Sequence, residues 1–189
     1  MAMWQRFFDL VFATLGLLLG LPIFILVFLI ALADTGSPIF LQERLGVDKR
    51  PFTLVKFRTM PKKTASVATH LADFAEISRI GRFLRLTKLD ELPQLWNVLK
   101  GDMSLVGPRP GLSNQTELTK AREKLAVFDV RPGITGLSQI KGVDMSNPEI
   151  LAKSDASMIA NMSLKNYFLY LFATLLGRGS GDRIPAYKD

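Results

Sequence analysis

The sequence lacks cysteine and contains a single histidine, His70, among its 189 residues. Disulfide bonds, thiolate nucleophiles and cysteine-ligated zinc are therefore excluded, and several histidines cannot share a metal ion within the chain. A Ser-His-Asp triad would have to use His70, which lies in the polar, turn-prone segment 61–76, a poor setting for a rigidly held base. Acid–base or covalent chemistry therefore falls mainly to Asp, Glu, Lys, Ser or Tyr.

Acidic residues are also scarce relative to basic ones, with 17 Asp and Glu against 24 Lys and Arg and a net charge of +7. This excess favours anionic partners, which include nucleic acid, anionic lipid and phosphorylated substrates. The length suits one domain of modest size, and a hydrophobic fraction of 48% is high for a purely soluble domain. Neither a Rossmann fingerprint nor an internal repeat is present.

Residues 10–33 contain no charge, and about 24 such residues are enough to cross a bilayer core. The run is too long for a cleavable signal peptide. Pro22 lies near its centre and predicts a kink or break, which leaves a spanning helix and a re-entrant helix as equally supported anchors. Lys and Arg dominate after the run, so the positive-inside rule places the main domain in the cytoplasm. The residues just before the uncharged run combine aromatic and basic side chains, which suits a membrane interface: Trp4, Arg6, Phe7 and Phe8.

Two short alternating runs, 39–42 and 52–57, flank a polar turn and predict a β-hairpin. Lys56 and Arg58 would share one face of the second strand, where they either hold a phosphate or lie on a solvated edge. Farther along, Arg79, Arg82 and Arg85 recur every three residues. A helix would bring them together as a candidate site for an anion or a membrane surface.

Asp90 and Glu91 are adjacent carboxylates, placed immediately before a helix that Pro93 starts and Gly101 ends. The backbone N–H groups at a helix N-terminus favour anions. Carboxylates surrounded by cations stay ionised and are able to act as nucleophiles or metal ligands. A charged helix cap among solvated arginines explains the same residues equally well.

Two loops rich in Pro and Gly each present one arginine. Arg109 lies in the sequence GPRP, and Arg131 begins the sequence RPGITGLSQ. A rigid loop that carries one Arg suits bidentate phosphate recognition, although a surface turn has the same composition. Gly133 and Gly136 would let the backbone approach a ligand closely.

Helices are predicted at 113–126, 149–160 and 163–176. The last has apolar residues at helical spacing over most of its surface, which indicates deep burial or a place in the membrane interface. The motif GRGSGD, residues 177–182, resembles a phosphate loop only superficially and indicates a flexible helix end.

Taken in order, these motifs resemble the bacterial sugar transferase family, and in particular its small monotopic phosphoglycosyl transferases. The resemblance covers residues 6–181, and its most specific part is the block LDELPQLWNVLKGDMSLVGPRP, residues 89–110. It implies a mostly helical α+β fold with an N-terminal re-entrant helix-break-helix anchor, residues 1–35, and a short β-hairpin. Residues 36–189 would form a compact helical catalytic domain with interfacial amphipathic helices, of which 163–176 is one.

The resemblance implies transfer of a phosphosugar from a UDP-sugar to a polyprenyl phosphate, such as undecaprenyl phosphate, with release of UMP. This would occur at the cytoplasmic face of the bacterial inner membrane and start the assembly of a surface glycan. By resemblance, Asp90 is the nucleophile that carries the phosphosugar, and Glu91 binds Mg²⁺ beside Asp90. Pro22 matches the kinking proline, and the implied substrate-binding residues are Lys56, Arg58, Arg85, Arg109, Arg131 and Gln139. Nucleic acid is not an expected partner, and the sugar, the polyprenol and the oligomeric state stay open.

The chain departs from the family's common patterns in several places. Lys88 and Leu21 stand where many members have Ser. Asp155 fits a D-x-x-Y pattern, but Met158 and Tyr167 replace its Tyr and a later Asp. The segment GVDMSNPE, residues 142–149, departs from a GRN pattern in a region implied to read the sugar.

Two other functions fit part of the sequence. A membrane-anchored basic protein that binds anionic lipid or nucleic acid would need only the anchor and the charge. Against it, the basic residues are spread among rigid loops rather than clustered in one run. A metal-dependent phosphohydrolase would use the same two carboxylates, with water in place of the lipid acceptor.

Overall fold

The computed structural model of the protein describes residues 2–62 and 77–178. His70 and the motif beyond Arg178 lie outside these residues, so the expectations for them stay predictions. Within the described ranges helices predominate, and the strands form two two-stranded sheets. The predicted class, a mostly helical α+β fold with a long apolar N-terminal helix, is confirmed.

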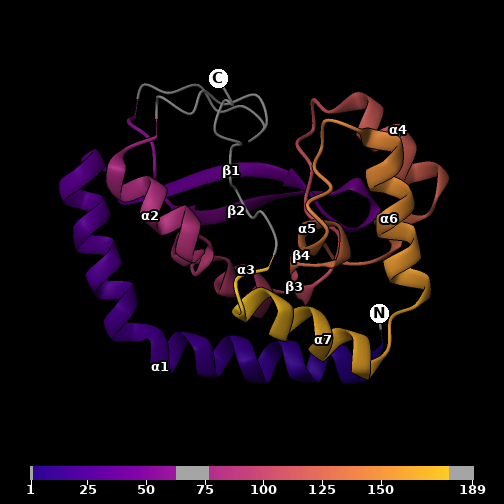
Figure 1. Ribbon diagram of the computed structural model, residues 1–189, viewed down its shortest axis with the longest axis horizontal. Coiled ribbons are helices and arrows are strands. Elements are labelled where there is room, and N and C mark those ends of the chain that lie inside the picture. The colour runs from indigo at the N-terminus through magenta and orange to yellow at the C-terminus, as the bar shows by residue number, and fades with distance from the viewer. Residues whose placement is uncertain (1, 63–76, 179–189) are drawn as a thin grey trace.

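The first element is the helix α1 (Met3–Thr35), which is long and apolar enough to cross a membrane. Figure 1 shows it running along one edge of the molecule and then turning along the end of the molecule. Pro22 lies inside the helix, and a proline that lacks its N–H and clashes with the preceding turn is the usual cause of such a bend. The predicted kink is therefore a bend within a helix that stays continuous from Met3 to Thr35.

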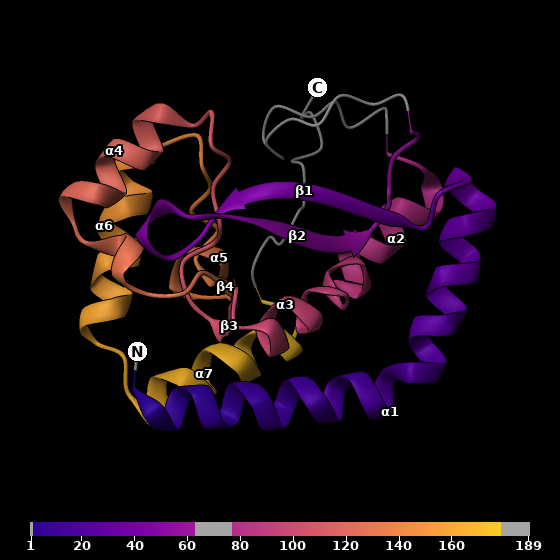
Figure 2. The same cartoon turned by 180° about the vertical axis from the view of Figure 1, so that it is seen from behind.

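The β-hairpin is confirmed, with its first strand longer than expected. The strands β1 (Ile39–Leu45) and β2 (Pro51–Phe57) pair antiparallel, with Ile39 opposite Phe57 and Leu45 opposite Pro51. The short 3-10 helix η1 (Val47–Lys49) connects them, and Asp48 at φ 53° tightens the turn. Seen from behind, the hairpin runs between the two ends of the molecule (Figure 2).

A second sheet was not predicted. The strand β3 (Ser104–Val106) pairs in parallel with β4 (Gly133–Thr135), with Ser104 opposite Gly133 and Val106 opposite Thr135. A Cβ atom on Gly133 would lie 2.0 Å from the backbone nitrogen of Gly107. Gly133 is therefore needed for the close approach of two backbone segments, and its expected approach to a ligand stays a prediction.

Of the other helices, the five longer ones match the expected positions to within a few residues at each end, whereas the short helices at 89–91, 127–129 and 137–140 were not predicted. In chain order they are α2 (Arg79–Thr87), η4 (Leu89–Glu91), α3 (Gln94–Lys100), α4 (Thr116–Lys124), η5 (Val127–Asp129), α5 (Leu137–Ile140), α6 (Pro148–Ala160) and α7 (Leu164–Leu175). Figures 1 and 2 both place α4 beside α6 at one end of the molecule and the rising part of α1 at the other. The two strand pairs lie between these ends.

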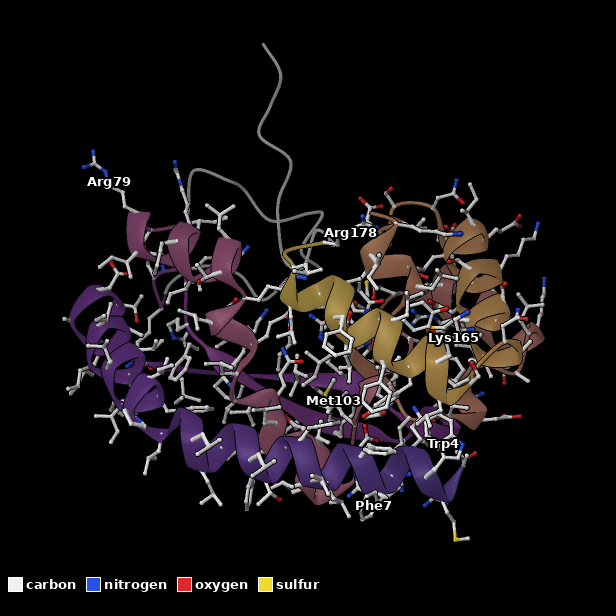
Figure 3. All side chains as sticks on the ribbon, turned by 60° about the horizontal axis from the view of Figure 1, so that its bottom comes forward. Trp4, Phe7, Arg79, Met103, Lys165 and Arg178 are labelled. Atoms are coloured by element: carbon white, nitrogen blue, oxygen red, sulfur yellow. The ribbon has the colours of Figure 1, made fainter. Side chains whose placement is uncertain are left out.

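Two hydrophobic clusters hold α1 to the rest of the protein. The larger one surrounds Met103 and Tyr167 and receives Phe8 and Phe12 from the first half of α1. Figure 3 shows Met103 between α1 and α7, while Phe7 points away from the domain. The smaller cluster joins Val27 of the second half to apolar residues of β2, α2 and the turn beyond it: Phe57, Leu84, Leu89 and Leu92.

Candidate active site

Asp90 and Glu91 lie on one tight turn, η4, between α2 and α3. Lys88 adopts a left-handed conformation, with φ 59°, that ends α2 and starts this turn. Leu89 and Leu92, on either side of the two carboxylates, pack into the smaller hydrophobic cluster. The turn is thus held by apolar contacts, and Asp90 and Glu91 are only 1% and 5% exposed. The expectation that both carboxylates precede a helix is confirmed by α3.

Arg109 reaches this turn from the loop that follows β3. Its guanidinium Nη1 lies 3.3 Å from Glu91 Oε1, and both side chains are largely buried. Pro108 and Pro110 flank Arg109 and fix φ at both positions, so the loop has little backbone freedom. The structure therefore brings together the carboxylate pair and the arginine of the GPRP sequence, which lie far apart in the chain.

Lys56 lies on β2, which packs on η4, and Arg58 directly follows this strand. Both cations lie over the ring of Phe40, at 5.7 Å for Lys56 Nζ and 5.2 Å for Arg58 Cζ. The prediction that they share one face is confirmed, but Lys56 is buried and is not part of a solvated edge. Arg58 also donates hydrogen bonds to the carbonyl oxygens of Ser37 and Ile39, so it supports the entry into β1.

Arg85 is the buried member of the arginine series on α2. Its Nε donates a 2.8 Å hydrogen bond to Thr59 Oγ1, just beyond β2. Arg79 and Arg82 are exposed, and Figure 3 shows Arg79 projecting from the molecule. The helix therefore divides the series, with Arg85 directed inward toward β2 and the other two on the surface.

Arg131 precedes β4, and Gln139 lies on α5. Arg131 Nε donates to the carbonyl of Gly101 at 2.7 Å, and its side chain lines a pocket of about 240 Å³ with Trp4, Gln5 and Met158. Gln139 is 8% exposed, and neither atom of its amide has a hydrogen-bond partner within residues 2–62 and 77–178. The amide of Gln139 is thus buried without the hydrogen bonds that such a group usually makes.

Two buried polar clusters were missed by sequence reasoning. In the first, Asp9 Oδ1 accepts hydrogen bonds from the N–H of Leu105, at 3.0 Å, and from the hydroxyl of Tyr167, at 2.8 Å. Burial raises the pKa of the Tyr167 hydroxyl, and the Asp9 carboxylate raises it further. The only signal was an acidic residue at the edge of a long apolar run, and it does not reveal a partner 158 positions away.

The second cluster joins Arg122 on α4 to Asp155 on α6. Arg122 Nη2 lies 2.6 Å from Asp155 Oδ2, and Ser138 Oγ donates to Asp155 Oδ1 at 2.7 Å. Burial raises the pKa of the Asp155 carboxyl, while the Arg122 cation and the Ser138 hydrogen bond act in the opposite direction. Asp155 had been noted only as a match to a family pattern, and nothing in the sequence paired it with Arg122.

The carboxylate pair could bind a divalent cation only if substrate phosphates and water complete its coordination. Among the residues that the structure describes, no three His, Cys, Asp or Glu side chains gather closely enough to enclose an ion. Two adjacent buried carboxylates do suit Mg²⁺, which is bound by one or two carboxylates together with substrate phosphates and water. Asp90 and Glu91 would be the residues that hold it.

Sequence comparison identifies the relatives of this site. Residues 1–178 match the model of the family described as bacterial sugar transferase. The chain belongs to the bacterial sugar transferase family. The resemblance stated from the motifs is therefore confirmed over nearly the whole chain.

Curated members of the bacterial sugar transferase family carry related names. A UDP-galactose-lipid carrier transferase from Erwinia amylovora is 38% identical over 90% of this chain and 39% of its own length. A UDP-glucose:undecaprenyl-phosphate glucose-1-phosphate transferase from Caulobacter vibrioides is 42% identical over 74% of this chain and 54% of its own length. The exopolysaccharide production protein ExoY of Rhizobium meliloti is 35% identical over 94% of this chain and 88% of its own length. The chain thus spans less than two thirds of the first two relatives and most of the third.

Proposed function

We propose that this bacterial sugar transferase moves a sugar phosphate from a UDP-sugar to a polyprenyl phosphate, with undecaprenyl phosphate as the expected acceptor. The name of the Caulobacter relative, which specifies a UDP-sugar donor and undecaprenyl phosphate, supports both substrate classes. The observation that carries the proposal is the buried pair Asp90 and Glu91, with the Arg109 guanidinium 3.3 Å from Glu91. Such a group combines a nucleophile with a cation for phosphoryl oxygens.

The transfer takes two steps. First, a carboxylate oxygen of Asp90 attacks the phosphorus that bears the sugar; an acyl-phosphate bond forms, the bond to the bridging oxygen breaks, and UMP leaves with that oxygen. Second, a phosphate oxygen of the polyprenyl phosphate attacks the same phosphorus, the acyl-phosphate bond breaks, and the Asp90 carboxylate is regenerated. Two steps let a soluble donor and a lipid acceptor use one small site in turn.

Both steps bring negatively charged phosphoryl oxygens close to carboxylates, so the site needs fixed cations. Arg109 lies beside Glu91, and the buried cations Lys56 and Arg85 come from the adjoining β2 and α2. Fixed cations stabilise the charge that develops on a transferring phosphoryl group. Mg²⁺ held by Asp90 and Glu91 would neutralise further charge on the donor diphosphate. On the family resemblance, we also assign substrate contacts to Arg58, Arg131 and Gln139.

The acceptor phosphate lies at headgroup level, so the site must lie at the membrane surface. The exposed apolar side chains of α1, among them Leu18 and Leu19, support an anchor embedded in lipid. Exposed Leu169 and Phe172 on α7 support contact with the membrane interface. The bend of α1 supports a re-entrant anchor, and the basic residues after it favour the cytoplasmic face.

A donor screen tests the function. Purified protein in lipid nanodiscs is mixed with undecaprenyl phosphate, Mg²⁺ and a panel of UDP-hexoses and UDP-N-acetylhexosamines. We expect UMP and a lipid-linked diphosphate sugar from at least one donor. Free sugar phosphate as the product would favour the phosphohydrolase instead, and no UMP from any donor would contradict both enzymatic functions.

A further inference from the structure

A buried polar cluster lies where α4, α5 and α6 meet. Its members Arg122, Ser138 and Asp155 are 2%, 1% and 0% exposed. Arg122 Nε and Nη2 donate to Asp155 Oδ2 at 3.0 and 2.6 Å, and Ser138 Oγ donates to Asp155 Oδ1 at 2.7 Å. The carboxylate is thus held on one oxygen by Arg122 and on the other by Ser138, which fixes the orientation of both charged groups.

Arg122 also reaches the loop of the proposed active site. Its Nη1 donates a 2.8 Å hydrogen bond to the backbone carbonyl oxygen of Arg109. The guanidinium is a planar, rigid fork, so the two contacts with Asp155 determine the direction in which Nη1 points. Asp155 therefore fixes Arg122, and Arg122 fixes the main chain of the residue whose side chain lies 3.3 Å from Glu91.

The neighbouring carbonyls of this loop are held as well. Pro108 O accepts from the N–H of Gly133 at 2.8 Å, and Pro110 O accepts from Arg44 Nη1 at 3.0 Å. Gly111 O accepts from the N–H of Leu45 at 3.0 Å. The carbonyls from Pro108 to Gly111 are therefore held by β4, α4 and β1, and the carbonyl of Arg109 is held by the buried ion pair of Arg122 with Asp155.

We propose that Arg122, oriented by Asp155, is a positioning residue for Arg109. It would set the backbone at Arg109 so that the guanidinium points at the carboxylate pair. This inference rests on the proposed function in one respect: it assumes that Arg109 takes part in the transfer of the sugar phosphate. Stability alone is a poor explanation for this cluster, because a buried ion pair often contributes little compared with well-packed apolar residues. Positioning gives the pair a role that apolar side chains could not perform.

The test is a double-mutant cycle between Arg122→Lys and Arg109→Lys. Lysine keeps a positive charge beside Asp155 but lacks the fork that reaches Asp155 and the Arg109 carbonyl together. We expect Arg122→Lys to lower kcat for UMP release by roughly 10–100-fold, because small misplacements of catalytic groups have effects of that size. In the Arg109→Lys background the same change should lower kcat by less than about threefold, because the group that Arg122 positions is already altered. Equal factors in both backgrounds would overturn the proposal.

Two controls separate positioning from a loss of folding. Glu123→Gln removes an exposed ion pair with Lys49 from the next position of α4 and should leave kcat unchanged. If Arg122→Lys fails to fold, the pair replacement Arg122→Met with Asp155→Leu removes both buried charges and the bond to Arg109 O. That variant should fold and still show the loss of kcat; full activity in it would contradict the proposal.

A spectroscopic measurement keeps this inference separate from the enzymatic proposal. The ¹⁵Nε–H resonance of Arg109, assigned by its disappearance in Arg109→Lys, reports the surroundings of the guanidinium whether or not UMP is released. Arg122→Lys should shift this resonance, and Glu123→Gln should not. A resonance that stays unchanged in Arg122→Lys would exclude positioning even if wild-type protein proves active.

Discussion

The two halves of α1 are attached to the protein by different kinds of contact. Before Pro22, polar side chains bind the backbone of the domain: Gln5 donates to the carbonyl of Val106, and Asp9 accepts from the N–H of Leu105. After Pro22 the buried residues are Val27 and Ala31, which offer only apolar contacts. The first half is therefore held in one register and orientation by buried directional bonds, whereas the second half is held mainly by packing, with one exposed hydrogen bond from Ser78 to Asp34.

Both halves also contact segments that flank the proposed site. The first half binds β3, which leads directly into the loop that carries Arg109, and Arg6 donates to the carbonyls of Val98 and Leu99 on α3, the helix after the carboxylate turn. The second half packs on Leu89 and Leu92, on either side of the carboxylate pair. The two parts meet at the ion pair between Arg109 and Glu91. We therefore expect the bend in α1 to influence how the arginine loop and the carboxylate turn face each other, and substitutions in each half test this separately.

The largest effect should come from the turn that the second half supports. Asp90→Asn keeps the shape of the side chain but removes the proposed nucleophile, so we expect transfer to fall by more than about 10³-fold. UMP release in nanodiscs measures this, and thermal unfolding should be close to that of the wild type. Asp48→Asn, at an exposed position on η1, serves as the matched control. Substantial activity in Asp90→Asn would refute the assigned role.

The polar attachment of the first half should dominate its stability. Asp9→Leu leaves the Leu105 N–H and the Tyr167 hydroxyl buried without their acceptor, so the free energy of unfolding should fall by about 2–4 kcal/mol. Asp9→Asn retains an acceptor oxygen and should lose roughly 1 kcal/mol or less. Chemical unfolding in detergent distinguishes the two, and equal losses would show that the hydrogen bonds are not what holds this half.

Pro22 lies at the bend between the two halves of α1, and Pro22→Ala should reduce the angle between them. Alanine restores a helical hydrogen bond and removes the ring clash, so α1 should straighten and kcat should fall about tenfold as the two loops move apart.

Because the sequence has no cysteine, thiol labelling of Ala2→Cys and Ser37→Cys reports on which side of the membrane each end of α1 lies. Both thiols should label from the same side of the membrane in a re-entrant anchor; labelling from opposite sides would establish a spanning helix.

The smallest effect is expected in the apolar attachment of the second half. Val27 is 3% exposed, and Val27→Ala removes two buried methyl groups, which should lower the free energy of unfolding by about 1–2 kcal/mol. Leu19→Ala, at a position that is 77% exposed, should change it little in detergent. A loss in Val27→Ala as large as that in Asp9→Leu would remove the distinction between the two halves.

Local sequence signals were enough for most helices, the hairpin and the carboxylate turn. Pro93 and Gly101 bound α3 as expected, and the resemblance to the family brought Asp90, Glu91 and Arg109 into one site. Contacts between distant segments were not predictable in the same way. Each strand of the β3–β4 pair has only three residues, too few for an alternating pattern. Likewise, the bonds from Asp9 to Tyr167 and from Arg122 to Asp155 depend on tertiary packing that no local pattern encodes.

The most direct test of the central claim is intact-protein and peptide mass spectrometry after mixing purified protein with the active UDP-sugar and Mg²⁺ in the absence of any lipid acceptor. The account predicts release of UMP in an amount close to that of the enzyme, and a mass increase of one phosphosugar on the peptide that contains Asp90. Turnover that begins only when the polyprenyl phosphate is present, with no adduct on Asp90 at any time, would contradict it.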